Sequence, residues 1–98
     1  MKTNDYGDVI IFNSIDDFYF KEEAGIKPNT VRIPKDKHEY DLMMDFLESI
    51  KNNSRFIEIH NKISPHLYFK RMLRDVSMLK IGNVTFYNEY IFIFSWKE

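Results

Sequence analysis

A glycine and a proline three residues apart, Gly25 and Pro28, fix where one helix must end and one strand must begin. A helix that starts after Ser14 is expected to end at Gly25, because glycine adopts the left-handed conformation after a last helical turn without a steric penalty. Pro28 lacks a backbone donor and pushes the preceding Lys27 into extended geometry. We therefore expect Asn29–Ile33 to start a strand at the edge of a sheet.

Polar side chains share one face of this expected strand. Period-two alternation places Thr30 and Arg32 on one side and the apolar residues on the other. A guanidinium offers five fixed N–H donors and threonine a hydroxyl, which suits an oxygen-rich ligand such as a phosphate, a carboxylate or a base edge. With Lys27 before it, the segment is a candidate binding edge. The alternative is a surface loop with a solvated arginine.

The spacing of Gly25, Lys27 and Arg32 matches a G-x-K-x-x-x-x-R motif. This motif resembles that of ASCH domains, small β-barrels similar to the RNA-binding PUA fold. The resemblance covers nearly the whole chain, because the expected order is also similar: a strand, a short helix, the motif before the next strand, and closing strands. It implies a cleft for a nucleotide or nucleic acid, lined by Lys27, Thr30 and Arg32.

Some ASCH-like proteins resemble amidohydrolases that act on modified nucleosides, with a lysine, a threonine and a glutamate implicated in the chemistry. Many ASCH sequences carry a glutamate two residues before the arginine, where this chain has Thr30. The loss of that carboxylate argues against hydrolysis by this chain. A hydrolase reading would need Lys27 and Thr30 together with another acid, and Glu22 or Glu23 on the preceding helix are the candidates.

Length and composition favour one globular domain over residues 1–98, with residues 1–7 as a loose leader. The chain is 44% hydrophobic and 16% aromatic, which argues against disorder. It lacks cysteine, a signal-peptide pattern and any apolar run of the roughly twenty residues needed to span a bilayer. We expect a cytoplasmic protein without disulfides. Its abundance of Asn, Lys, Ile, Phe and Tyr resembles products of AT-rich genomes, including bacteriophages.

The hydrophobic pattern predicts an α+β fold with two helices and five to six strands, arranged as a small PUA/ASCH-like, partly closed β-barrel. One helix is expected over residues 15–24, with Ile15, Phe18 and Tyr19 facing the core, and another after a cap at Asp36. Strands are expected at 8–12, 29–33, 55–60, 67–76, 84–87 and 90–96, with turns at 82–83 and 88–89. The same pattern also fits an open sheet with two helices on one side.

Charge is distributed unevenly, although the net charge is only −1. Residues 1–26 carry two lysines against six acids, whereas residues 51–80 carry seven basic residues against two acids. If the fold gathers the cations on one surface, a polyanion can bind locally. The alternative is that they pair with the acids of the helices. The candidate cations are Lys27, Arg32, Lys70, Arg71 and Arg74.

The preferred interpretation is a non-enzymatic module that binds RNA, another nucleic acid or a nucleotide, without cofactor or metal. Lys27 and Arg32 would supply charge, Asn29 and Thr30 hydrogen bonds, and further contacts would come from Lys70, Arg71 and Arg74. His38, His60 and His66 lack the spacing of metal ligands. One alternative is a small phage or bacterial interaction module that modulates a host protein; the second is the amidohydrolase. The oligomeric state stays open.

Overall fold

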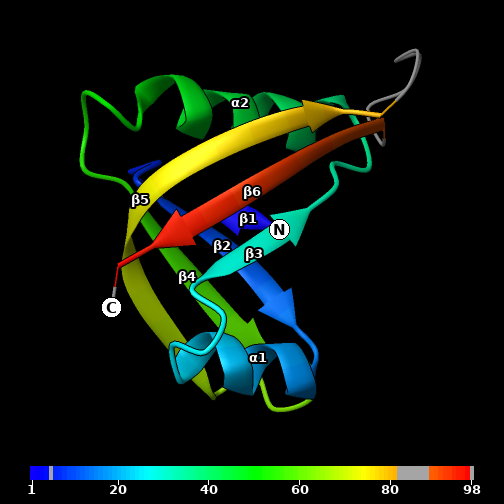
Figure 1. The fold of residues 1–98 in the computed structure, drawn as a ribbon, viewed down its shortest axis with the longest axis vertical. Coiled ribbons are helices and arrows are strands. Elements are labelled where there is room, and N and C mark those ends of the chain that lie inside the picture. Colours follow the sequence, from blue (N-terminus) through cyan, green and yellow to red (C-terminus); the bar gives the residue numbers. More distant parts are fainter. Residues whose placement is uncertain (5, 82–88, 98) are drawn as a thin grey trace.

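Within the residues that the structure describes, six strands form one mixed sheet and two helices lie at opposite ends of it (Figure 1). The structure is a computed structural model and describes residues 1–4, 6–81 and 89–97. The strands are β1 (Lys2–Thr3), β2 (Val9–Ser14), β3 (Asn29–Arg32), β4 (Phe56–Asn61), β5 (Tyr68–Lys80) and β6 (Tyr90–Trp96), and the helices are α1 (Asp16–Glu23) and α2 (Lys37–Ser49). The predicted α+β class is therefore confirmed.

The sheet runs in the order β1-β2-β4-β5-β6-β3, and only the β2–β4 pair is parallel. A parallel pair needs a long crossover, which α1, β3 and α2 provide here. Ile10 of β2 is in register with Ile57 of β4, and both side chains are fully buried. The parallel pairing also brings the carboxyl ends of both strands together, so that the Lys62 backbone N–H donates to the Ser14 carbonyl at 2.8 Å.

The sheet is curved but does not close into the barrel that the sequence predicted. β5 pairs with β4 through its first half and with β6 through its second half, and the register shifts between Leu73 and Asp75. In the described ranges β1 pairs only with β2, and β3 only with β6, which leaves the two end strands apart. Pro28 and Pro34 flank β3 and cannot donate to a ladder, which limits this end strand to four residues.

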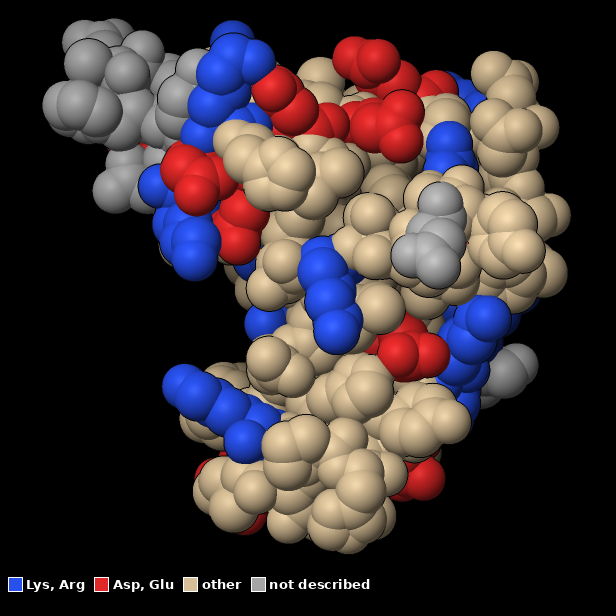
Figure 2. All heavy atoms as spheres, turned by 180° about the vertical axis from the view of Figure 1, so that it is seen from behind, with Lys and Arg blue, Asp and Glu red and all other residues tan. Residues whose placement is uncertain are grey.

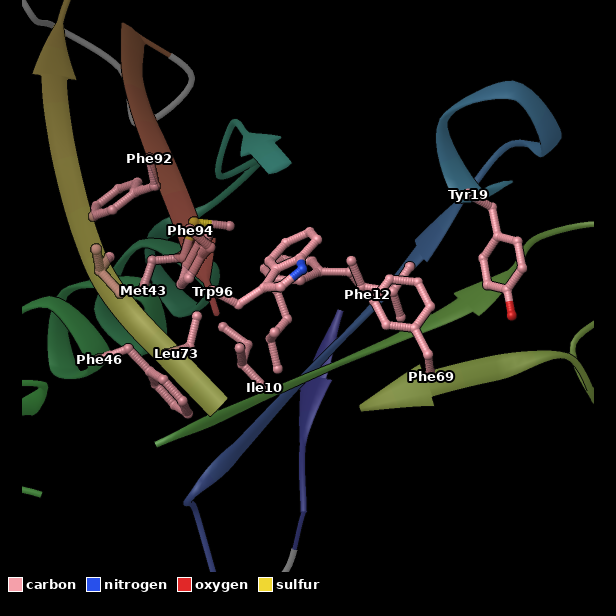
Figure 3. Packing of buried hydrophobic residues seen from close by; sticks show 13 residues of the cluster. Ile10, Phe12, Tyr19, Met43, Phe46, Phe69, Leu73, Phe92, Phe94 and Trp96 are labelled. Atoms are coloured by element: carbon pink, nitrogen blue, oxygen red, sulfur yellow. The ribbon is translucent and has the colours of Figure 1, made fainter. Parts of the chain in front are cut away.

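A row of aromatic side chains fills the concave side of the sheet (Figure 3). Trp96 lies beside Phe69, which in turn contacts Tyr19 of α1, with ring centroids 5.9 and 5.6 Å apart. Phe94 contacts Phe12 with centroids 5.2 Å apart. Strand β6 is thus interior, between β5 and β3, with Phe92 and Phe94 completely buried.

Helix α2 begins where the sequence predicted. The Asp36 carboxylate accepts a hydrogen bond from the Glu39 backbone N–H at 2.9 Å, which caps the first turn. Met43 and Phe46 are both buried, as the three-residue step between them requires. They close the end of the core that lies away from α1 (Figure 3).

Helix α1 differs from its prediction in which side chains it buries. Ser14 ends β2 instead of capping the helix, and the cap position is taken by Ile15 without a side-chain hydrogen bond. Of the three residues expected to face the core, only Tyr19 is buried, while Ile15 and Phe18 are 51% and 50% exposed. The helix does end as expected, because Gly25 adopts a φ of +79°.

Several boundaries also differ. Lys2–Thr3, within the segment expected to be a loose leader, pairs with Ile10 and Ile11 of β2. β5 extends four residues beyond the predicted end at 76. The predicted turn at 82–83, the strand at 84–87 and residue 88 of the expected hairpin lie outside the described residues. Among the helices that the structure describes, none has the length and apolar character needed to cross a membrane.

Candidate ligand-binding site

A cavity of about 380 Å³ lies where β2 ends, between α1 and β3. Its polar lining comes from four separate parts of the chain: the end of β2, helix α1, the segment from residue 27 to β3, and the residue that follows β4. Ile15, Phe18 and Val31 form an apolar margin, and each is about half exposed. The polar lining residues are Asn13, Ser14, Glu22, Lys27, Thr30, Arg32 and Lys62.

Arg32 connects the two sides of the open sheet. Its Nε donates to the Thr30 hydroxyl at 3.0 Å, within β3. Its other nitrogens reach across to β2, where Nη1 donates to the Asn13 carbonyl at 2.8 Å and Nη2 to the Ser14 hydroxyl at 2.7 Å. The guanidinium also lies over the Phe12 ring, 4.6 Å from its centroid. These contacts hold the arginine in one orientation. Two of its five N–H groups take no part in these three hydrogen bonds.

Glu22 is a buried carboxylate at the floor of the cavity, with only 1% of its surface exposed. Its Oε1 accepts from the Ser14 hydroxyl at 2.8 Å, and its Oε2 lies 3.3 Å from the Lys27 ammonium. Lys27 also donates to the Asn29 carbonyl at 2.8 Å. A buried carboxylate requires such partners, because an unpaired charge in the interior is strongly unfavourable.

The turn at the end of α1 explains how Lys27 reaches Glu22. The left-handed Gly25 reverses the chain, and its N–H donates to the Glu22 carbonyl at 3.3 Å. The Lys27 N–H then donates to the Lys21 carbonyl at 3.0 Å, which lays the chain back against the helix. The Lys27 ammonium also lies 5.5 Å from the centre of the Phe18 ring. The glycine of the motif therefore positions its lysine.

Burial lowers the pKa of Arg32, and the nearby Glu22 carboxylate opposes that shift. An arginine starts from so high a pKa that it stays protonated in proteins. The cavity consequently holds three cations, Lys27, Arg32 and Lys62, against the single carboxylate of Glu22. This excess of positive charge favours an anionic ligand.

The structure brings together some of the predicted site residues and separates others. Lys27, Thr30 and Arg32 all line the cavity, whereas Asn29 contributes its backbone carbonyl to Lys27. Of the two candidate acids, Glu22 lies in the cavity and Glu23 is an exposed residue outside its lining.

The cations of β5 do not line this cavity. Arg71 is in register with the buried Ile57 and donates to the Glu23 carbonyl at 3.4 Å. Lys70 belongs to the opposite face, where it lies over the Phe56 ring, and Arg74 is exposed. Figure 2 likewise shows Lys and Arg side chains dispersed over the rear face rather than gathered in one patch. The fold therefore does not gather the five candidate cations on one surface.

Sequence reasoning missed Lys62 and assigned Phe18 to the core. Lys62 reaches the cavity only because β2 and β4 pair in parallel, and no local sequence pattern predicts that pairing. Phe18 lies beside two other aromatic residues in α1, so helical periodicity alone does not decide which of the three faces inward.

The described part of the chain contains no group of three or more His, Cys, Asp or Glu side chains that could hold a metal ion. His60 instead pairs with Glu58 at 2.7 Å. No family model, curated protein or solved structure matches the chain. The resemblance to ASCH domains therefore rests on the motif and on the order of elements.

Proposed function

We propose that this protein is a binding module for a nucleotide or a nucleic-acid strand, and that the cavity at the end of β2 is its binding site. The observation that carries the proposal is the meeting of Lys27, Arg32 and Lys62 around one cavity with a single carboxylate. The volume of about 380 Å³ falls within the range of about 300–1,000 Å³ typical of small-ligand pockets.

The unused hydrogen-bonding capacity of the site suits a phosphate. Arg32 keeps two N–H groups beyond its three bonds to the protein. Among the described residues, no acceptor pairs with the ammonium of Lys62, which lines the same cavity. A phosphate oxygen placed between these two groups would receive charge-assisted hydrogen bonds from both.

The apolar margin of the cavity suits a base. Phe18 is half exposed at the cavity, and single-stranded nucleic acids commonly stack their bases on such rings. Thr30 is buried and lines the same cavity. The likeness of Gly25, Lys27 and Arg32 to the ASCH motif supports the same ligand class, since the lysine and arginine of that motif line this cavity.

Binding is best tested with Lys62, because Arg32 also holds parts of the protein together. We expect Lys62→Ala to weaken the binding of short labelled single-stranded RNA, measured by fluorescence anisotropy at two salt concentrations, and to reduce the salt dependence. Lys51→Ala is the matched control, since Lys51 is exposed and does not line the cavity. If Lys51→Ala and Lys62→Ala lower the affinity for RNA equally, the cavity is not the binding site.

Absence of binding to RNA, DNA and nucleotides would remove the proposal and favour a protein partner instead. Lys70→Ala tests the alternative that nucleic acid binds on the outer face of β4 and β5 and not in the cavity. If that variant loses binding while Lys62→Ala does not, nucleic acid binds on the outer face.

Hydrolysis of an acylated nucleoside is a second candidate function, favoured by the buried pair of Glu22 and Lys27 beside Thr30. In amide hydrolysis, water adds to the carbonyl carbon, the C–N bond breaks, and an acid and an amine are released. In this candidate, the Glu22 carboxylate would take a proton from the attacking group and Lys27 would stabilise the negative charge on oxygen. Failure of the purified protein to turn over acylated nucleosides would remove this candidate. Turnover that is unchanged in Glu22→Gln would also reject the assigned roles.

A further inference from the structure

A second cavity, of about 280 Å³, adjoins the first along the gap between β2 and β3. The two cavities share Asn13, Arg32 and Lys62 in their linings. The remaining walls of the second cavity are one carboxylate and four apolar side chains, of which Phe12 and Met43 are almost completely buried. These walls are Met1, Phe12, Ile33, Glu39 and Met43. The open edge of the sheet therefore carries one groove with two compartments.

Positive charge is concentrated where the compartments meet. Arg32 and Lys62 line both cavities, whereas the Lys27 ammonium lies in the first and is paired with Glu22. In the second cavity, Glu39 supplies a negative charge. An anionic group is thus favoured at the boundary, and the far compartment favours a neutral group with hydrogen-bond donors.

The position of Arg32 at this boundary is fixed before any ligand arrives. Its three hydrogen bonds extend to both sides of the gap, from Thr30 on β3 to Asn13 and Ser14 on β2. A guanidinium held in this way loses little conformational entropy on binding, which increases its contribution to affinity.

We propose that the groove binds two consecutive nucleosides of one strand, with the phosphodiester that links them placed at Arg32 and Lys62. This inference rests on the proposed function and specifies its ligand. One base stacks against Phe18 in the first cavity, and the next base contacts Ile33 in the second. The Glu39 carboxylate accepts from sugar hydroxyls or base amino groups, and it disfavours a terminal phosphate there. The smallest complete ligand is a dinucleoside monophosphate.

The chain offers two matched positions for the test. Val31 and Ile33 are each 51% exposed and lie two residues apart on the same extended segment. Val31 lines only the first cavity and Ile33 only the second. A glutamate at either position places a like charge near the phosphate in one compartment, without filling the core.

The experiment compares ribodinucleoside monophosphates with nucleoside 5′-monophosphates by isothermal titration calorimetry. We expect the dinucleoside ligands to bind about tenfold more tightly or better, which is the gain typical of one further stacked base. Val31→Glu should weaken both ligands. Ile33→Glu should weaken the dinucleoside monophosphates by about the same factor, and weaken the mononucleotides much less than Val31→Glu does. Circular dichroism confirms that both variants are folded.

Equal affinity for the two ligand classes would overturn the two-nucleoside groove and leave the proposed function intact. Equal weakening of mononucleotides by Ile33→Glu and Val31→Glu would overturn it as well, because the cavities would then act as one. Absence of binding for every ligand would reject the proposed function together with this inference.

Discussion

Replacing Arg32 with lysine should destabilise the protein although the charge is kept. A lysine at this position can donate to one of the three acceptors that Arg32 now satisfies, the Thr30 hydroxyl, the Asn13 carbonyl and the Ser14 hydroxyl. Two charge-assisted hydrogen bonds are therefore lost. Each such bond contributes about 1.5–3 kcal/mol when buried.

The expected total is smaller than the sum of two buried bonds. Arg32 is only partly buried, and water can reach the Asn13 carbonyl, which lies at an exposed residue. The Ser14 hydroxyl also keeps its bond to Glu22. We therefore expect Arg32→Lys to lower the free energy of unfolding by about 2–3 kcal/mol, near the low end of the range for two such bonds.

Urea unfolding at neutral pH, followed by circular dichroism, measures this difference. Arg74→Lys is the matched control, because Arg74 is exposed and is expected to change stability by less than about 0.5 kcal/mol. If Arg32→Lys changes the free energy of unfolding no more than Arg74→Lys does, the side chain does not connect β3 to β2.

Two further perturbations test the local structure around α1. Gly25→Ala should lower the free energy of unfolding by about 1–2 kcal/mol, because Gly25 has a φ of +79°. Thermal unfolding measures this difference, and no change would mean that the turn is not left-handed. Burial raises the pKa of Tyr19, Glu23 raises it further and Arg71 opposes them. Because the folded-state pKa exceeds the usual value near 10, stability from this group is complete below that pH and is lost as pH rises through the raised pKa. Tyr19→Phe should flatten this alkaline loss in urea unfolding, and an identical pH profile in the variant would contradict the shift.

Local signals in the sequence located most elements correctly. Gly25 and Asp36 mark a helix end and a helix start through backbone conformation and capping, which depend on few neighbours. The predicted strand at 55–60 likewise matches β4, in which Ile57 and Ile59 are buried. Such features are readable because each is decided within a few residues.

Features that depend on distant segments were not readable. The parallel pairing of β2 with β4 places Lys62 in the site, and nothing near Lys62 signals it. The prediction of a partly closed barrel was wrong for a similar reason, since closure depends on whether the short β3 pairs with β2. Arg71 and Lys70 are neighbours in β5, so the alternation of a strand separates them and the five candidate cations cannot all converge.

The most direct test of the binding site is amide chemical-shift mapping during a titration with a short single-stranded oligoribonucleotide. We expect the largest shifts at residues around the cavity, such as Lys27, Val31 and Lys62. Shifts confined to the outer face of β4 and β5, around Glu58 and Lys70, or no shifts at saturating ligand, would contradict it.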